Sequence, residues 1–492
     1  MSKNPTPLER VREFEREQAL KLSADERPLF HLTPLVGWMN DPNGFCYYKG
    51  QYHLFYQYHP FSRQWGPMHW GHAVSGDLLH WTYMPCALAP DTAADAGGCF
   101  SGSAVETPDG RLMLVYTGVQ PAGTFRRETQ AQCIAIGDGK DFEKSLLNPV
   151  IRHCHLPEGY SEFDFRDPKV WREANGMYRM AVGNRHEERS GTVLLMESKD
   201  GLEWNYITEI DACRKEYGRM WECPDFFPLD GTQVLLVSPQ EMHAREEFHA
   251  GFGTVCILGD WNEKDCRFER KHIQPVDHGL NFYAPQTVLA PDGRRIMIGW
   301  MDNWETCKEA PRRHPWYAQM SAPRELRVEK GRLMQRPVRE IETLWQDTVL
   351  HDSVTVKEET TLPGVQGRLM DMTVNLLPST GSACRRFTLH VAKDASHYVE
   401  IRCDLARGEL VFDRSHGGSH RDIAHTRHVK AEVRDGKLTL RLLLDKESVE
   451  LFINDGERVV TSLIPTPLAA EEITFAADAP LLLSAEAHHL KA

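Results

Sequence analysis

Three acidic residues in proline-containing runs are the first candidates for chemistry. They are Asp41 in the run NDP, Asp167 in RDP and Glu222 in ECP. Hydrolysis of a glycosidic bond needs one ionised carboxylate and one protonated carboxyl group at the scissile bond. Donors around Asn40 would keep Asp41 ionised, and the negative charges nearby would disfavour a further charge on Glu222. These residues therefore indicate glycoside hydrolysis first, although an Asp before Pro, seen alone, is often only a turn-initiating residue.

The elements around these residues form a repeat. Five times, an apolar run meets a turn signal and a second apolar run follows, with first runs beginning near residues 44, 101, 168, 225 and 285. Units of this length accommodate four-stranded blades, which favours a five-bladed β-propeller. Recurrence by accident in an irregular all-β domain is the alternative. In a propeller the equivalent inner positions face one channel, so the three acids should meet in one pocket.

The remainder of the chain has a different pattern of apolar residues. After about Leu344, alternating apolar residues in 438–444 and 449–453, with the turn signal NDG at 454–456, predict an all-β sandwich. Residues from Pro7 to about Lys21 predict a short amphipathic helix. We therefore expect an all-β protein with an N-terminal helical segment (1–28), a propeller catalytic domain (29–345) and a C-terminal sandwich (346–492).

Composition limits the classes of partner. The 492 residues include 57 Lys and Arg against 70 Asp and Glu, a net charge of -13, which disfavours nucleic acid and anionic membranes as partners. The basic start of the sequence lacks a following apolar stretch, so we expect a cytoplasmic protein. The 12 cysteines lack metal or redox spacing, and His69 and His72 have no further ligands at zinc spacing. We expect no metal and no cofactor.

Seven sequence blocks resemble those of one enzyme family. They occur in the family's order and span nearly the whole propeller region: WMNDPNG at 38–44, WGPMHWGHA at 65–73, FSGS at 100–103, FRDP at 165–168, WECPD at 221–225, FYAPQ at 282–286 and PREL at 323–326. Residues 448–456 are similar to the family's C-terminal sandwich. The family that they resemble is that of the β-fructosidases, glycoside hydrolase family 32, which includes invertases and sucrose-6-phosphate hydrolases.

The resemblance implies a role for each acid. Asp41 would be the nucleophile that forms a covalent fructosyl-enzyme, Glu222 the acid and later the base, and Asp167 a transition-state stabiliser, with retention of configuration. The fructose subsite would be lined by Asn40, Gln57, Trp65, Phe100, Ser101, Arg166 and Tyr283. Purely structural roles remain open for several of these: Trp65 and Phe100 as blade packing, and Gln57 as a solvent-facing strand residue.

The expected activity is release of terminal non-reducing β-D-fructofuranosyl residues from sucrose, sucrose 6-phosphate or short fructo-oligosaccharides. Fructosyl transfer through the same intermediate and non-catalytic fructan binding are the alternatives. Arg312, Arg313 and His314 would contact a substrate phosphate if their loop reached the pocket, but they also fit a solvated basic loop. For the sandwich we expect a role in packing or in assembly of a homo-oligomer, with polysaccharide binding as the alternative.

Overall fold

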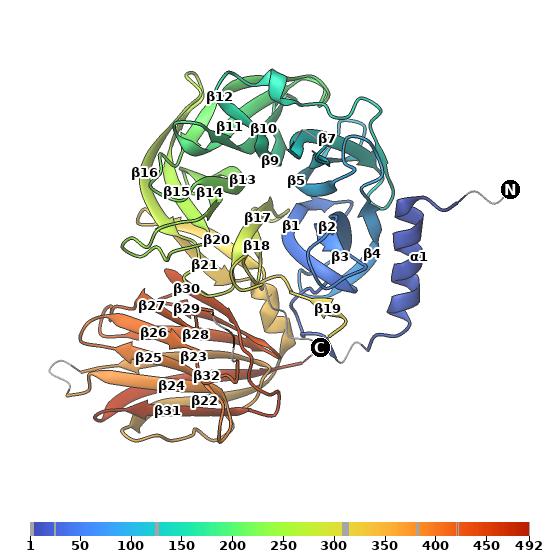
Figure 1. Cartoon of the computed structure of the whole chain (residues 1–492). Helices are drawn as coiled ribbons and strands as arrows, with labels where there is room; N and C mark the ends of the chain where they lie inside the picture. The colour runs from blue at the N-terminus through green and yellow to red at the C-terminus, as the bar shows by residue number, and fades with distance from the viewer. Residues whose placement is uncertain are drawn as a thin grey trace.

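The computed structural model describes residues 4–23, 26–123, 127–307, 314–379, 383–419, 421 and 423–491. These residues form seven β-sheets, five in the first part of the chain and two in the second. In Figure 1 the five sheets surround a common centre, with β1, β5, β9, β13 and β17 innermost. The prediction of a five-bladed propeller followed by a sandwich, with a short N-terminal helix, is confirmed.

Each blade is an antiparallel sheet of four strands in a simple meander. The strands of the first two blades are β1 (Gly37–Tyr48), β2 (Gln51–His59), β3 (His69–Ser75), β4 (Trp81–Leu88), β5 (Gly98–Glu106), β6 (Leu112–Gln120), β7 (Thr129–Gly137) and β8 (Phe142–Lys144). Those of the other three are β9 (Tyr160–Arg172), β10 (Tyr178–His186), β11 (Ser190–Ser198), β12 (Trp204–Ala212), β13 (Met220–Leu229), β14 (Thr232–Gln240), β15 (Val255–Asn262), β16 (Arg267–Pro275), β17 (Tyr283–Leu289), β18 (Arg295–Trp300), β20 (Arg324–Glu329) and β21 (Arg332–Pro337).

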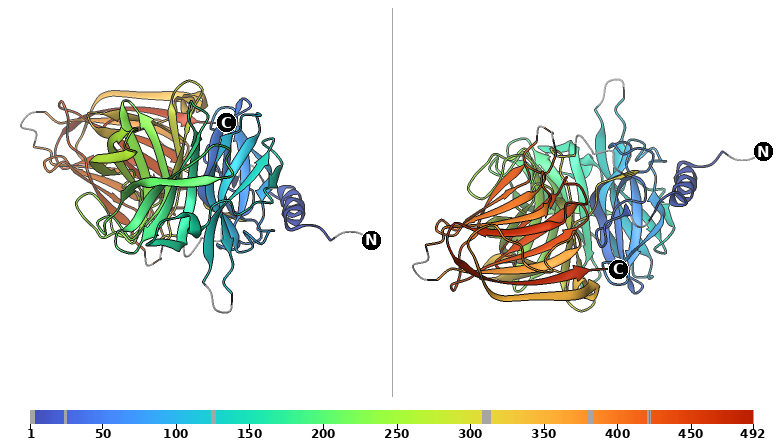
Figure 2. Two further views of the ribbon diagram at one scale, coloured as in Figure 1. Left: turned by 90° about the horizontal axis from the view of Figure 1, so that it is seen from above. Right: turned by 90° about the horizontal axis from the view of Figure 1, so that it is seen from below.

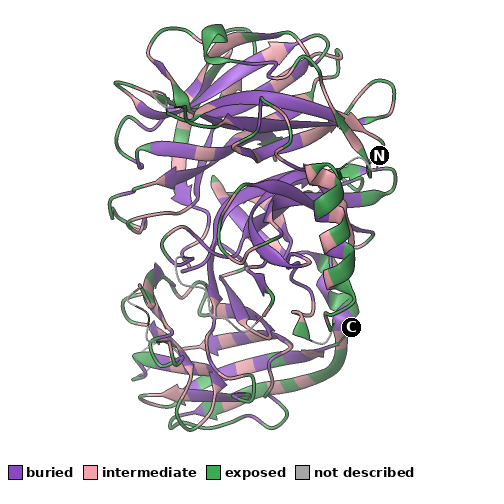
Figure 3. Ribbon diagram, turned by 45° about the vertical axis from the view of Figure 1, so that its right-hand side comes forward, coloured by how far each residue is buried: buried purple, intermediate pink, exposed green. Residues whose placement is uncertain are grey.

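The five hairpins expected from the sequence are the two inner strands of each blade. In the first and fourth blades the turns are two residues long, Lys49-Gly50 and Asp230-Gly231, and all four residues have positive φ. Such turns match the right-handed twist of the strands they join. A short parallel strand, β19 (Trp316–Tyr317), adds to β1 of the first blade. The inner strand β1 is buried along most of its length, whereas β9 is buried mainly in its middle and has exposed residues near both ends. Figure 3 shows the buried strands in the interior of the propeller.

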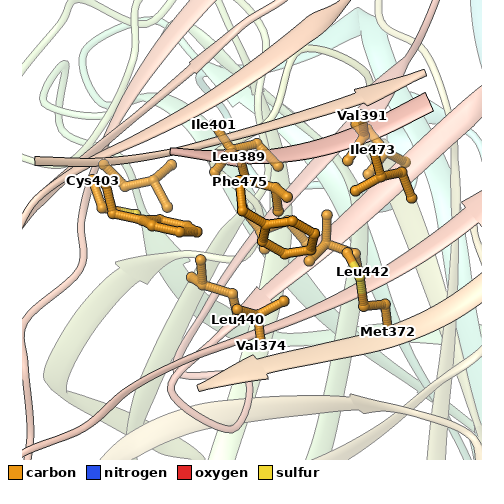
Figure 4. Packing of buried hydrophobic residues seen from close by; sticks show 14 of the residues in the cluster. Met372, Val374, Leu389, Val391, Ile401, Cys403, Leu440, Leu442, Ile473 and Phe475 are labelled. Atoms are coloured by element: carbon orange, nitrogen blue, oxygen red, sulfur yellow. The ribbon is translucent and has the colours of Figure 1, made fainter. Parts of the chain in front are cut away.

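The second part of the chain is a sandwich of a six-stranded and a five-stranded sheet. The first contains β22 (Trp345–Val356), β23 (Met370–Leu377), β28 (Leu438–Asp445), β29 (Ser448–Ile453), β30 (Arg458–Leu463) and β32 (Leu481–Leu490). The second contains β24 (Arg386–Lys393), β25 (Val399–Asp404), β26 (Glu409–Asp413), β27 (Thr426–Lys430) and β31 (Glu472–Ala477). In Figure 4, Phe475 and Leu389 of one sheet meet Leu440 and Leu442 of the other, so the alternation read from the sequence marks the core face.

The helix α1 (Pro7–Ala19) begins with a capping box between Thr6 and Glu9. It packs on β4 at the outside of the first blade, where Glu15 accepts a hydrogen bond from the backbone N–H of Cys86. Two further 3₁₀ turns are η2 (His153–His155) and η3 (Arg339–Leu344). Figure 2 shows α1 at the edge of the propeller and the sandwich beside it. In the part of the chain that the structure describes, no helix is long and apolar enough to cross a bilayer.

The propeller and the sandwich meet through buried ion pairs. Arg324 of β20 is fully buried and contacts both Asp277 of the propeller, at 2.9 Å, and Glu450 of the sandwich, at 2.5 Å. His31 lies between Asp445 and Glu450, at 2.8 and 2.9 Å. Because a buried charge without a partner is costly, these contacts fix how the two parts fit together.

Candidate active site

Each inner strand has an irregular register at the position that the sequence repeat marks. The ladders to the second strands shift within residues 39–42, 100–102, 166–169, 222–225 and 283–286. In three blades the residue before the proline has a positive φ: 66° at Asp167, 48° at Cys223 and 50° at Ala284. Such bulges re-aim side chains, and strained backbone of this kind gathers at functional sites. The repeated bulge turns side chains of different blades toward the same centre.

A cavity of about 260 Å³ lies where these strands converge. All of the candidate residues except Tyr283 line it, including the three acids. The lining consists of Asn40, Asp41, Gln57, Trp65, Phe100, Ser101, Arg166, Asp167, Glu222, Gln240, Phe252 and Trp304. Residues far apart in the sequence therefore form one pocket, as the repeat predicts.

Asp41 on β1 is buried among hydrogen-bond donors. The Ser101 hydroxyl donates to Oδ2 at 2.7 Å and the Asn40 amide donates to Oδ1 at 3.0 Å. The Cys223 thiol lies 3.6 Å from Oδ2. Burial, and then the negative charge of Glu222, raise the pKa of Asp41 to about 6, while these donors oppose the rise. Asp41 is therefore half ionised near pH 6 and largely ionised at neutral pH.

Asp167 on β9 is held by backbone as well as side-chain contacts. Its Oδ2 accepts a hydrogen bond of 3.0 Å from the backbone N–H of Cys223, and its own N–H donates to the Thr117 hydroxyl. Burial raises the pKa of Asp167, and the nearby Arg166 guanidinium opposes that rise. Cys223 thus contacts two of the three acids, through its thiol and through its backbone.

Glu222 on β13 forms an ion pair with Arg166. The sequence did not indicate this pairing. Arg166 donates to Oε1 from Nε and Nη2, at 3.1 and 3.0 Å, and also donates to Asp164 at 2.9 Å. The Tyr283 hydroxyl donates to Oε2 at 2.6 Å. The sequence led us to expect only nearby negative charges, which disfavour a further charge on Glu222. The positive charge of the Arg166 guanidinium offsets that effect.

Tyr283 differs from the sequence expectation. It was expected in the wall of the subsite, but its side chain is 1% exposed and lies behind Glu222. Its hydroxyl also makes a 2.9 Å hydrogen bond to the Ser238 carbonyl. The register shift that follows Tyr283 in β17 leaves the ring among aromatic and sulfur-containing neighbours rather than at the pocket surface.

The remaining candidates occupy the wall and the rim. Trp65 is 49% exposed and meets Phe100 edge to face, with ring centroids 6.0 Å apart. Gln57 is buried rather than solvent-facing and donates to the Cys99 carbonyl at 3.0 Å. Asn40 accepts a 2.7 Å hydrogen bond from the Trp38 indole, which fixes the orientation of its amide.

Three lining residues were not foreseen: Gln240, Phe252 and Trp304. Gln240 ends β14, and the other two lie in connections outside the repeat. The sequence contained one feature that could have pointed to Trp304: it ends the run MDNW, which directly follows the fifth hairpin.

The basic stretch considered for phosphate contact does not bear on this pocket in the described chain. Arg312 and Arg313 lie outside the described residues. His314 is not part of the pocket: it stacks on Trp316, with ring centroids 4.5 Å apart, and contacts Glu447 of the sandwich at 3.3 Å. No group of three or more His, Cys, Asp and Glu suited to a metal occurs among the residues that the structure describes.

Comparison with known proteins identifies the family. The N-terminal domain of glycosyl hydrolases family 32 matches residues 31–337, and the family's C-terminal domain matches residues 340–489. The chain belongs to glycoside hydrolase family 32. Among curated relatives of this family 32 protein, a sucrose-6-phosphate hydrolase of Escherichia coli is 39% identical over 455 residues, covering 89% of this chain and 90% of the relative. A raffinose invertase of Escherichia coli is 38% identical over 447 residues, with 89% of each chain covered.

Solved structures support the same membership. A family 32 β-fructofuranosidase of Bombyx mori is similar with a TM-score of 0.84 and 31% identity, over 98% of this chain and 97% of that one. A sucrose-6-phosphate hydrolase of Lactobacillus gasseri is similar with a TM-score of 0.82 and 27% identity, over 98% and 96%. The predicted family is confirmed, and with it the prediction that this family 32 chain is a glycosidase of the β-fructofuranosidase type.

Proposed function

We propose that this family 32 enzyme releases terminal β-D-fructofuranosyl residues from sucrose, sucrose 6-phosphate or short fructo-oligosaccharides. The observation that carries the proposal is the meeting of three carboxyl groups, from three blades, with one arginine in a single cavity. A cavity of about 260 Å³ suits one terminal sugar ring rather than the interior of a polymer. The relatives named sucrose-6-phosphate hydrolase and raffinose invertase support this choice of substrate class.

We assign the nucleophile to Asp41. Its two oxygens are oriented by Ser101 and Asn40, and it is largely ionised at neutral pH because its pKa is about 6. Attack on the anomeric carbon would give a covalent fructosyl-enzyme, and water would release the sugar in a second displacement with overall retention. The donors around Asp41 hold the attacking oxygen in place.

We assign the acid and base to Glu222. Proton delivery to the leaving oxygen and later activation of water both require a carboxyl group that is held still at the pocket wall. Arg166 donates a hydrogen bond to one oxygen of Glu222 and Tyr283 donates to the other, and these two bonds hold the carboxyl group in place. When Glu222 has given up its proton, the Arg166 guanidinium stabilises the resulting carboxylate.

We assign substrate positioning to Asp167 and to the pocket walls. Asp167 would accept hydrogen bonds from fructose hydroxyls, which strengthen as positive charge develops on the sugar. Trp65 and Phe100 present ring surfaces at the rim, and Phe252 and Trp304 extend the aromatic wall. Gln57 and Gln240 add amide groups for reading hydroxyls.

We place catalysis in residues 29–345 and give residues 346–492 a packing role, with assembly of a homo-oligomer as a further use of the sandwich surface. Buried ion pairs such as Arg324 with Glu450 support the packing role. We also propose a cytoplasmic location. All twelve cysteines are free thiols, which suits a reducing compartment.

Fructosyl transfer and non-catalytic fructan binding are less well supported. A binding protein has no need of three buried carboxyl groups, since burying each of them costs free energy. Transfer shares the first half of the reaction and differs in the acceptor, so analysis of products at high sucrose concentration distinguishes it from hydrolysis.

The deciding experiment measures kcat/KM with sucrose and with sucrose 6-phosphate at matched concentrations, following glucose and glucose 6-phosphate. We expect release of fructose from both, and the ratio of the two values identifies the physiological substrate. Absence of fructose release from either sugar, from a protein that unfolds cooperatively, would contradict the proposal.

A further inference from the structure

A second cavity, of about 440 Å³, lies between the propeller and the sandwich; we call it the interdomain cavity. On the propeller side its described walls come from Asn281, from residues 302 and 306, and from residues 314–319, which include β19. On the sandwich side they come from segments after β26 and β30 and from Glu447. Figure 1 shows β19 at this junction. The interdomain cavity shares no lining residue with the catalytic pocket, and its volume is within the range of small-molecule sites.

Arg414 is the unusual residue of this cavity. It is 4% exposed, and all three hydrogen bonds of its Nη1 go to neutral acceptors: Asn281 Oδ1 at 2.7 Å, Ser462 Oγ at 3.1 Å and the Leu463 carbonyl at 2.8 Å. Among the described residues no carboxylate lies within 4 Å of it, and its Nε and Nη2 donate no hydrogen bond. Buried arginines are normally paired with an anion. The guanidinium of Arg414, in contrast, has no counter-charge in direct contact.

The carboxylate of Asp302, whose charge acts on Arg414, already accepts other hydrogen bonds. Asp302 accepts hydrogen bonds from the Asn281 amide at 3.0 Å, the Asn303 backbone at 2.9 Å, and the hydroxyls of Thr306 and Tyr317. Burial lowers the pKa of Arg414 to about 10; the charge of Asp302 opposes that change, whereas neighbouring arginines add to it. Arg414 therefore stays protonated at neutral pH with its charge uncompensated by direct contact.

His425 adds a second unused polar atom to the same wall. Its Nε2 lies 3.0 Å from the Arg421 carbonyl and donates to it. Its Nδ1 is buried and has no hydrogen-bond partner among the described residues. A buried polar atom of this kind costs free energy unless a ligand or water satisfies it. Nδ1 can accept from a ligand hydroxyl or, when protonated, donate to an anion.

We propose that the interdomain cavity binds a phosphate monoester of about the size of a sugar phosphate, with two phosphate oxygens on Nε and Nη2 of Arg414. The fork of a guanidinium matches two oxygens of a phosphate group. The other walls combine apolar side chains, such as Ile464 and Leu463, with the amide of Gln319 and with the charged groups of Arg421 and Glu447. Such a mixed lining suits a small polar organic body. The source of the phosphate is either a sugar ester or free inorganic phosphate.

The test is calorimetric titration of the whole protein with glucose 6-phosphate, with inorganic phosphate and with glucose. Arg414→Gln removes the charge from the cavity. Arg407→Gln removes the same charge from an exposed position of the sandwich, where the side chain is 75% exposed, and is the matched control. Because Arg414 also joins the two domains, Ser419→Phe provides a second variant, which fills the cavity and leaves Arg414 in place.

We expect one equivalent of glucose 6-phosphate to bind, with affinity reduced about tenfold or more in Arg414→Gln and in Ser419→Phe and unchanged in Arg407→Gln. If inorganic phosphate binds as tightly as glucose 6-phosphate, the site is one for free phosphate. If inorganic phosphate binds more weakly than glucose 6-phosphate, the site is one for the ester. The proposal is overturned if neither phosphate compound binds, if glucose binds as tightly as its phosphate, or if both cavity variants bind like the unmodified protein. The readout is binding, so the result does not depend on the proposed hydrolase activity.

Discussion

The Tyr283 hydroxyl donates a 2.6 Å hydrogen bond to Oε2 of Glu222. Burial raises the pKa of Tyr283 well above its ordinary value, so the hydroxyl remains a donor throughout the pH range of an assay. The ring does not line the pocket. Tyr283 is therefore a positioning residue, acting on substrate only through the carboxyl group that it restrains.

Removing this hydroxyl by Tyr283→Phe should lower kcat about tenfold to hundredfold. The hydrogen bond is made to the carboxylate that Glu222 becomes as it gives up its proton, and a hydrogen bond to a charged group contributes about 1.5–3 kcal/mol. KM should change little, since the ring lies outside the pocket wall. Steady-state kinetics check this, with Tyr47→Phe at an exposed position as the control. A raised KM with unchanged kcat would argue for direct substrate contact instead.

The Ser101 hydroxyl should control the acidic limb of the pH profile. A nucleophilic Asp41 must be ionised, so kcat/KM should fall as pH decreases through about 6, its pKa. Ser101→Ala removes a donor that stabilises the ionised form, which raises the pKa and moves the limb to higher pH. The limb should stay in place in Ser103→Ala, whose hydroxyl contacts the Pro168 carbonyl. A shift to lower pH in Ser101→Ala would contradict this account.

Replacing Asp41 by Asn should abolish turnover without loss of the fold. The amide is not a nucleophile, and removal of a buried charge that is costly to keep ionised should not lower stability near neutral pH. Fructose release and the thermal unfolding midpoint are measured together. Activity within tenfold of the unmodified enzyme would exclude Asp41 as nucleophile.

His31 should make stability depend on pH in the alkaline range. Burial alone would lower its pKa, but hydrogen bonds and the charges of Asp445 and Glu450 outweigh burial and raise it to about 9. Since this value exceeds that of an unfolded histidine, the stabilisation is complete below about pH 6.5 and is lost as pH rises through 9. It amounts to the order of 3 kcal/mol.

Urea unfolding between pH 6 and 10 tests this expectation. The difference in unfolding free energy between the unmodified protein and His31→Gln should be largest at pH 6 and shrink toward pH 10. His80→Gln, at a half-exposed histidine, is the control for removal of an imidazole from the surface. A difference that is constant with pH would mean that His31 contributes only through packing.

The sequence predicted the pocket well where the repeat applies. Asp41, Asp167 and Glu222 could be brought together because blade geometry places equivalent positions at one centre, and the structure adds the bulge that turns them inward. Phe252 and Trp304 could not be found in this way, since they lie in connections that do not repeat.

Contacts between distant segments were also beyond the reach of sequence patterns. The pairing of Arg166 with Glu222 changes the electrostatics expected for the acid, yet the two residues are 56 positions apart. The interdomain cavity depends on how two separately patterned domains pack, and neither domain's periodicity contains that information. Nothing in the sequence distinguishes Arg414 from an arginine at the surface, and its burial is visible only in the structure.

The most direct test of the central claim is capture of the covalent intermediate. In Glu222→Gln, β-fructofuranosyl fluoride should react at the nucleophile, because fluoride leaves without a proton, and the adduct should persist because the base is missing. Peptide mass spectrometry then locates the sugar. The account predicts one fructosyl group on the peptide that contains Asp41, and none when Asp41→Asn is added. A fructosyl group on Asp167, or none on any residue, would contradict it.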